Sequence, residues 1–401
     1  MKNVSNLELS ISKNYVCTWG LWEAIREILQ NAQDSSKDGN KIKISYDNGT
    51  LDISNLGEFK LPISSLVLGN SVKSDGSIGK YGEGYKLALL VLLRLGLNVK
   101  IYNQEELWTP YFEMSKKYGT EVLKISIEPY DSFGELRFSI SGINSLDTEM
   151  LKKNSLVLSE QLGKHIGRTV DTDYGKILLD SSQEGRFYVE GLFIQKDDTF
   201  KYGYSFNSDS VSLDRDRRAI NYYDLLDLTA DALLSLKSDF SIVETSITSK
   251  TKDTLKIDDF YKEASKEFSV GYAKHFLEKH ELDEDTFIGT EKEILVSGST
   301  KAFKTDMVQA SIVNKGLNKE EEYAKIKSLA LDKTNKDTMY LEYSKSPLKL
   351  LNEWVVKNSK MVGKKRTSEL LEISSEFSYS SFSSIKEEIL TNVKERIEEI
   401  K

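Results

Sequence analysis

Hydrophobic residues recur at helical spacing in two long segments near the beginning of the chain. The first segment runs from Trp19 to Ser36, and its apolar positions are Leu21, Trp22, Ile25, Ile28, Leu29 and Ala32. This spacing places the apolar side chains on one face and predicts a helix over 19–36. The second segment, from Gly82 to Leu95, is almost continuously apolar and predicts another helix. Between them, Pro62 favours a short helix over 61–68.

Alternation of apolar and polar residues predicts strands in the same part of the chain. Lys41–Tyr46 and Thr50–Ser54 alternate, and Asn48-Gly49 between them is a strong hairpin signal. Further strands are expected at 97–102, 121–127 and 136–140. The first 155 residues therefore combine helices with a sheet.

The remainder of the chain is expected to form two further parts. The expected elements of the next part are a connecting helix, two strands and a second helix, at 146–158, 176–179, 186–194 and 222–238. After residue 250 the clearest feature is a capping box at Ser384–Glu387, which opens an apolar stripe that ends at Ile400. We therefore expect an α+β protein with a first domain at 1–155, a smaller α/β domain at 156–250 and a helix-rich region at 251–401.

Composition narrows the class of protein. The 401 residues carry 55 Lys and Arg against 63 Asp and Glu, and 39% of them are hydrophobic, which excludes a disordered chain and a disulfide scaffold. The single cysteine and the three scattered histidines argue against a zinc site. No signal peptide is expected, and the longest apolar run, 87–97, is too short to span a membrane. We therefore expect a cytoplasmic protein, whose net charge of −8 disfavours non-specific nucleic-acid binding.

Three polar residues share one stripe of the first predicted helix. Glu27, Asn31 and Asp34 are spaced at i, i+4 and i+7. An amide oxygen can ligate a hard cation such as Mg²⁺, while a carboxylate can orient or deprotonate a water molecule. A stripe of this kind is also typical of an ordinary solvated helix face, so it predicts little by itself.

A glycine-rich segment, Gly79-Lys80-Tyr81-Gly82-Glu83-Gly84-Tyr85-Lys86, precedes the second predicted helix. Glycines let the backbone approach a polyphosphate closely, and the N–H groups at a helix start favour anions. The segment is not a P-loop, because Tyr81 occupies the Ser/Thr position, and it is not a Rossmann turn, because no strand precedes it. Taken alone, it could equally be a plain structural turn.

Together the two segments resemble the GHKL ATPase superfamily, which includes gyrase-type topoisomerases, mismatch-repair proteins, large heat-shock chaperones and histidine kinases. Glu27–Asp34 resembles the N box of that family, and Gly79–Tyr85 resembles its second glycine box in the chaperone version. The resemblance implies a Bergerat-type α/β sandwich that binds ATP and Mg²⁺. It also implies that Asn31 ligates the metal, that Glu27 activates the attacking water, and that the amides of Gly82 and Gly84 hold the phosphates.

The first glycine box of the family departs from its pattern here. Where the family has an Asp that accepts a hydrogen bond from the adenine amino group, this chain has Asn55, followed by Gly57 and then by Phe59 in place of a glycine. An asparagine oxygen can still accept that bond, but the side chain also carries a donor. Asp52 would compensate if alternation along the strand turned it toward the nucleotide.

Three further features are matched by the resemblance and have ordinary structural alternatives. Thr120, after Gly119, resembles a nucleotide-site Thr or is simply a strand start, and 69–76 is a candidate lid or a passive loop. Arg217, and after it Arg215, resembles a loop arginine that reaches the γ-phosphate from a neighbouring domain, or pairs with nearby Asp residues. The expected nucleotide-binding set is Asn31, Asp34, Asp52, Asn55, Gly57, Gly79, Lys80, Tyr81, Gly82, Glu83, Gly84, Lys86 and Thr120, with Glu27, Arg217 and Arg215 as catalytic residues.

The sequence thus predicts Mg²⁺-dependent ATP binding and slow hydrolysis, which would close the lid and switch the conformation on a DNA or protein client. An ATP-dependent homodimer is a further expectation. The alternative is a regulatory or interaction protein that binds nucleotide without hydrolysing it. Glu27 favours the ATPase, because hydrolysis requires a group that activates water. A histidine kinase is disfavoured, since no histidine precedes the predicted ATP domain.

Overall fold

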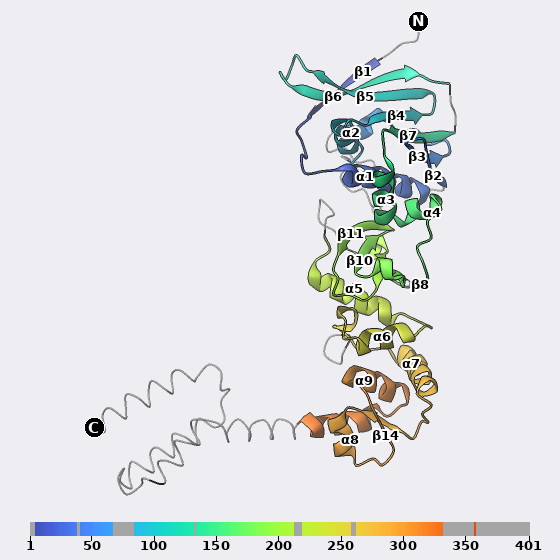
Figure 1. Cartoon of the computed structure of the whole chain (residues 1–401), viewed down its shortest axis with the longest axis vertical. Helices are drawn as coiled ribbons and strands as arrows, with labels where there is room; N and C mark the ends of the chain where they lie inside the picture. Colours follow the sequence, from blue (N-terminus) through green and yellow to red (C-terminus); the bar gives the residue numbers. More distant parts are fainter. Residues whose placement is uncertain are drawn as a thin grey trace, which may run out of the picture. The chain divides into compact units, whose positions relative to one another are not determined.

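The computed structural model describes residues 5–37, 41–66, 84–131, 134–211, 219–257, 262–331 and 357. The chain divides into two compact units. Met1–Leu282 with Ser311–Gly316 form the first unit, and Asp283–Ala310 with Leu317–Lys401 form the second. Each unit contains helices and strands, so the protein is α+β, as the sequence predicts (Figure 1).

A seven-stranded sheet occupies the beginning of the chain. Its strands lie in the order β1-β6-β5-β4-β7-β3-β2, and every neighbouring pair is antiparallel. The strands are β1 (Ser5–Ser12), β2 (Lys41–Asp47), β3 (Thr50–Leu56), β4 (Asn98–Asn103), β5 (Glu106–Met114), β6 (Glu121–Pro129) and β7 (Glu135–Ser141). The sequence prediction missed β1 and β5. β5 contains Pro110, a residue that usually argues against a strand inside a sheet.

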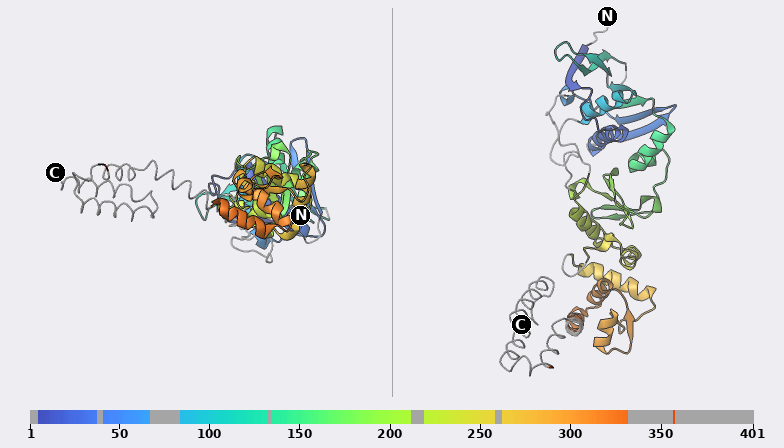
Figure 2. Two further views of the ribbon diagram at one scale, coloured as in Figure 1. Left: turned by 90° about the horizontal axis from the view of Figure 1, so that it is seen from below. Right: turned by 60° about the vertical axis from the view of Figure 1, so that its left-hand side comes forward.

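Two helices cover one face of this sheet. α1 (Leu21–Lys37) packs on β2 and β3, while α2 (Gly84–Arg94) packs on β4, β5 and α1 (Figures 1 and 2). Ile28 of α1 and Leu90 of α2 are buried in the core that the helices share with the sheet. The structure therefore confirms the two helices that the apolar spacing predicts.

The β2–β3 hairpin also confirms its prediction. Asn48 and Gly49 have φ angles of 46° and 78°, the left-handed conformation that a two-residue hairpin turn requires at both positions. After β3, the predicted short helix is a single 3₁₀ turn, η1 (Ile63–Leu66).

Two segments that the sequence predicts as single elements are interrupted. The predicted helix at 146–158 divides into α3 (Ser145–Asn154) and α4 (Leu156–Gln161), because Ser155 is extended and its hydroxyl caps α4 at the Leu158 N–H. The predicted strand at 186–194 turns back on itself at Glu190-Gly191, where both residues have positive φ.

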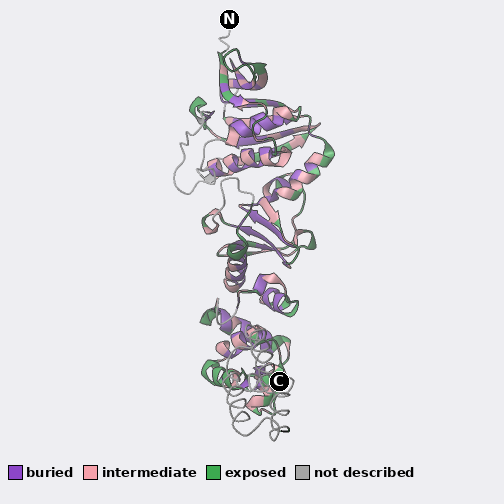
Figure 3. Cartoon of the chain, turned by 90° about the vertical axis from the view of Figure 1, so that its left-hand side faces the viewer, coloured by how far each residue is buried: buried purple, intermediate pink, exposed green. Residues whose placement is uncertain are grey.

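The second sheet has five strands in the order β11-β10-β12-β9-β8. Its strands are β8 (Thr169–Thr172), β9 (Gly175–Leu178), β10 (Arg186–Val189), β11 (Leu192–Lys196) and β12 (Gly203–Phe206). β10 and β12 are parallel and the other pairs are antiparallel. The rings of Phe187 and Tyr204 stack at 5.7 Å, and those of Tyr204 and Phe206 at 5.6 Å, so aromatic side chains make the core of this sheet. Its three central strands, β10, β12 and β9, are largely buried (Figure 3).

Helices make up most of the remaining described chain. The first unit continues with α5 (Tyr222–Leu234), α6 (Ser241–Thr248) and α7 (Lys266–Lys279). The second unit contains a parallel pair of short strands, β13 (Phe287–Gly289) and β14 (Ala302–Lys304), joined through α8 (Glu291–Ser297). α9 (Met307–Gly316) follows β14 in the chain.

Within the described part of the chain, no helix combines the length and the apolar character needed to cross a membrane. The helix predicted after Ser384 lies outside the described residues.

Candidate functional site

The polar stripe of α1 lies at the junction of this helix with α2. Asn31 donates from Nδ2 to the Glu27 carbonyl at 2.7 Å, which fixes the orientation of its carboxamide. The Glu27 side chain is 12% exposed, and its Oε1 lies 3.5 Å from Nη2 of the buried Arg26. A 3.5 Å ion pair is longer than the 2.7–2.9 Å typical of a charge-assisted hydrogen bond, so the carboxylate is only loosely held by this partner.

Gly84, the first residue of α2, packs against this stripe. A β-carbon at Gly84 would lie 2.5 Å from Oε2 of Glu27 and 3.4 Å from Nδ2 of Asn31. Real β-carbons do not approach an oxygen so closely, so a side chain at this position would displace the end of the Glu27 side chain. The polar stripe of α1 and the last glycine of the glycine-rich segment are therefore in contact, although Asn31 and Gly84 are more than 50 residues apart in sequence.

Asp34 and Tyr85 extend this contact toward the sheet. Tyr85 stacks on Phe138 of β7, with ring centroids 5.0 Å apart. Burial raises the pKa of the Tyr85 hydroxyl, and the negative charge of the buried Asp34 raises it further. Tyr85 is therefore a neutral hydrogen-bonding group at this position.

Asn55 joins the group from β3. It is buried, and its Nδ2 donates to the Ala32 carbonyl of α1 at 2.9 Å. The carbonyl can pair only with the amide nitrogen, so the amide oxygen of Asn55 is left to act as an acceptor. The amide N–H group that asparagine has and aspartate lacks is therefore already bonded to the Ala32 carbonyl.

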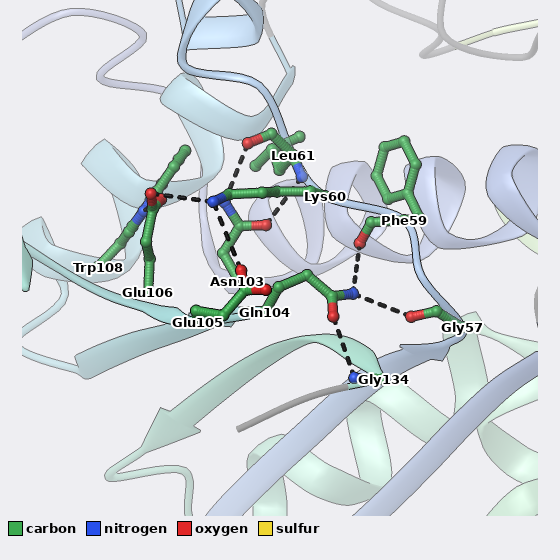
Figure 4. Close-up of polar contacts among 10 residues, drawn as sticks. All are labelled: Gly57, Phe59, Lys60, Leu61, Asn103, Gln104, Glu105, Glu106, Trp108 and Gly134. Atoms are coloured by element: carbon green, nitrogen blue, oxygen red, sulfur yellow. Dashed lines mark hydrogen bonds and ion pairs between the residues drawn. The ribbon is translucent and has the colours of Figure 1, made fainter. Parts of the chain in front are cut away.

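Gly57 lies two residues after Asn55 in a segment fixed by the β4–β5 turn (Figure 4). Its carbonyl accepts from Nε2 of Gln104 at 2.9 Å, and its N–H donates to the Gly134 carbonyl at 2.8 Å. Gly57 has a φ of 138°, which favours glycine. The backbone of Gly57 is therefore held in one conformation by Gln104 and Gly134.

Two expected nucleotide-binding residues lie away from this group. Asp52 does not compensate for Asn55, because Asn55 shares the helix-facing side of β3 with Leu51 and Ile53, and alternation turns Asp52 to the opposite face of the sheet. Thr120 is an exposed residue of the β5–β6 turn, and three strands separate β6 from β3. These two expectations are wrong because strand order and facing, which depend on long-range pairing, decide both positions.

Lys86 is described but completely buried within α2. Several other expected residues lie outside the described residues, and so does the candidate lid at 69–76. These residues are Gly79, Lys80, Tyr81, Gly82, Glu83, Arg215 and Arg217.

The end of the polar stripe also contacts the second sheet. Gln33 of α1 donates from Nε2 to the Glu190 carbonyl at 2.7 Å, in the turn between β10 and β11. The Glu190 carboxylate in turn accepts from the N–H and the hydroxyl of Ser208. A chain of hydrogen bonds therefore links α1 to the segment that follows β12.

The sequence prediction missed the carboxamides that hold the segment after Asn55. Asn103 and Gln104 are both buried polar residues in the β4–β5 turn. The available signal was weak, since Asn and Gln at a turn are ordinary, and only their burial shows that they bind backbone groups.

Within the described residues, no three or more His, Cys, Asp or Glu side chains are placed so that they could hold a metal ion. Asn31 remains a residue whose oxygen suits Mg²⁺, an ion that commonly keeps several water ligands and is completed by substrate phosphates.

Comparison with known proteins leaves the family open. No protein-family model matches this chain. The chain is similar to an uncharacterized protein of Mycoplasma pneumoniae, with 25% identity over 231 residues, which cover 54% of this chain and 91% of the relative.

Proposed function

We propose that the first sheet and its two helices form a GHKL-type, Bergerat-like domain that binds ATP with Mg²⁺ and hydrolyses it slowly. The observation that carries this proposal is the contact of Gly84 with Glu27 and Asn31. Two motifs that resemble nucleotide-binding boxes meet there, and Asn55 approaches the same helix from β3.

Each described residue in this group has a distinct role in the proposal. The Asn31 oxygen would hold Mg²⁺, which neutralises phosphate charge when it is bound. The Asn55 oxygen would accept a hydrogen bond from the adenine amino group, because its amide nitrogen is occupied by Ala32. Gly84 would let the phosphates approach the start of α2, where backbone N–H groups favour anions.

Glu27 would accept the proton of the attacking water. Its Oε1 faces Arg26, while its Oε2 faces Gly84, on the side where the phosphates are proposed to lie. A positioned carboxylate of this kind contributes about 10²–10⁴ in rate.

ATP binding would be transmitted to the rest of the first unit through α1. A bound nucleotide would order α1, and the Gln33–Glu190 hydrogen bond would carry this effect to the second sheet. Conformational switching on a DNA or protein client, with an ATP-dependent homodimer as the closed state, belongs to the same proposal, as does a cytoplasmic location.

The proposal is tested by calorimetry with Mg²⁺-ATP and by phosphate release, on the wild type and on Glu27→Gln. We expect both proteins to bind ATP, and we expect the variant to lose turnover by at least about 100-fold. Glu149→Gln is the matched control, since Glu149 is a solvent-exposed glutamate on α3.

The outcomes separate the two functions. Absence of ATP binding by the wild type would overturn the proposal entirely. Intact binding with equal, negligible turnover in the wild type and Glu27→Gln would leave the alternative, a regulator that binds nucleotide without hydrolysing it.

A further inference from the structure

The turn between β4 and β5 holds the segment that follows Asn55. This segment, 57–61, carries Gly57, which matches the glycine pattern of the resembled family, and Phe59, which departs from it. Figure 4 shows the carboxamides of Asn103 and Gln104 pointing into it from the turn. The loss of one glycine is thus accompanied by two side chains that fix the backbone.

Gln104 uses both ends of its amide. Its Nε2 donates to the carbonyls of Gly57 and Phe59, each at 2.9 Å, and its Oε1 accepts from the Gly134 N–H at 3.0 Å. Gly134 in turn accepts from the Gly57 N–H at 2.8 Å. One side chain therefore ties the segment after β3 to the beginning of β7.

Asn103 binds the far end of the same segment. Its Oδ1 accepts from the Leu61 N–H at 2.8 Å, and its Nδ2 donates to the Leu61 carbonyl at 2.9 Å. Asn103 is fully buried and Leu61 is 3% exposed, so water cannot replace these bonds. A carboxylate of the same shape could still accept from the Leu61 N–H, but it could not donate to the Leu61 carbonyl.

We infer that Asn103 and Gln104 are positioning residues for nucleobase selectivity. The inference rests on the proposed function, in which Asn55 accepts a hydrogen bond from the base. By fixing 57–61, the two amides hold the backbone on the C-terminal side of Asn55 in one conformation before the base arrives. Such preorganisation matters most for discrimination between bases, because a small displacement of one acceptor is enough to weaken it.

The test compares affinities for ATP and GTP, measured with Mg²⁺, for the wild type and Gln104→Glu. Glutamate has the same shape but cannot donate to the carbonyls of Gly57 and Phe59. We expect the preference for ATP over GTP to fall by about ten-fold. In Gln104→Lys, which keeps a donor, we expect the preference to remain closer to that of the wild type.

Two controls separate positioning from general loosening. Gln161→Glu alters another amide that binds backbone on the same sheet, at Ile42 and Ile44 of β2, and it should leave the preference unchanged. Lys60→Ala removes the ion pairs of Lys60 with Glu105 and Glu106 from the same segment, while both carboxamides remain. It should also leave the preference unchanged.

Equal ATP preference in Gln104→Glu and Gln161→Glu, with ATP still bound by the wild type, would overturn this inference alone. Absence of ATP binding by the wild type would instead overturn the proposed function. If Gln104→Glu does not fold, Gln104→Met takes its place, because it removes both ends of the amide. A ten-fold loss of preference relative to Gln161→Glu then supports the inference, and an equal preference overturns it.

Discussion

Two glutamates on helices, the buried Glu244 and the partly buried Glu27, differ in how their charges are satisfied. Glu244 of α6 is 6% exposed at its side chain and lies 2.9 Å from Lys279, 2.9 Å from His280 and 3.3 Å from His275. Glu27 of α1 is 12% exposed and lies 3.5 Å from Arg26. Only the Oε1 atom of Glu27 faces this cation, and its Oε2 atom faces the α-carbon of Gly84.

This difference separates a structural acid from a candidate functional one. Burial opposes the ionisation of Glu244, but hydrogen bonds and charges from Lys279 and His280, together with His275, outweigh it and lower the pKa of this carboxyl. A carboxylate saturated by fixed partners stabilises the fold and offers little to a ligand. A loosely paired carboxylate beside a glycine is suited to meet a substrate.

The largest effect should come from Glu244→Gln. Loss of the charge leaves three basic partners around a neutral amide, and we expect unfolding free energy to fall by about 2 kcal/mol at neutral pH. Urea denaturation measures this, with Glu278→Gln on the exposed side of α7 as the control.

The same variant has a defined pH dependence. The pKa of Glu244 is lower in the folded protein than its ordinary value of 4.5, so its stabilisation is complete above that value and is lost as pH falls through the lowered pKa. The gap in unfolding free energy between wild type and variant should therefore shrink as the pH falls below 4.5. A gap that stays constant with pH would contradict the assignment of the effect to the charge.

A smaller effect is expected from Asn55→Asp, the change toward the family residue. Aspartate cannot donate to the Ala32 carbonyl and places a charge in a buried position, so we expect a loss of about 1–2 kcal/mol in thermal or urea unfolding. Asn48→Asp, in the exposed hairpin turn, should cost little. A stabilising effect of Asn55→Asp would show that the amide nitrogen is not needed by α1.

The smallest effect is expected from Gly84→Ala. The new β-carbon displaces the end of the Glu27 side chain, which can rotate, so stability should change by less than about 0.5 kcal/mol. Affinity for Mg²⁺-ATP should fall about five-fold, or about 1 kcal/mol. Gly20→Ala is the control, since a β-carbon there meets Glu23 at an ordinary 3.5 Å. Equal affinities of Gly84→Ala and Gly20→Ala for Mg²⁺-ATP would show that Gly84 is not part of the proposed site.

Local rules explain which elements the sequence determined. Asn48-Gly49 adopts positive φ by the chemistry of its own residues, and the helices α1 and α2 follow from apolar spacing within one segment each. The same spacing placed Glu27 and Asn31 on one stripe, one helical turn apart. These features need no information from elsewhere in the chain.

The interruptions at Ser155 and Glu190-Gly191 required tertiary information. Ser155 pairs with Leu192 as an isolated bridge, and the Gly191 carbonyl accepts from the Leu156 N–H at 2.8 Å. The two interruptions therefore stabilise each other, although they are more than 30 residues apart in sequence. The periodicity within either segment contains no information about this contact.

For the candidate site, the sequence determined which residues carry suitable chemistry, and the tertiary structure decided which of them meet. The sequence left open which face of β3 Asp52 occupies, and it gave no sign that Thr120 lies three strands away from Asn55. It also could not show that Asn103 and Gln104 hold the segment after Asn55. The physical reason is the same in each case: strand order, facing and burial depend on pairings between distant residues, whereas residue type and helical spacing are properties of the local chain.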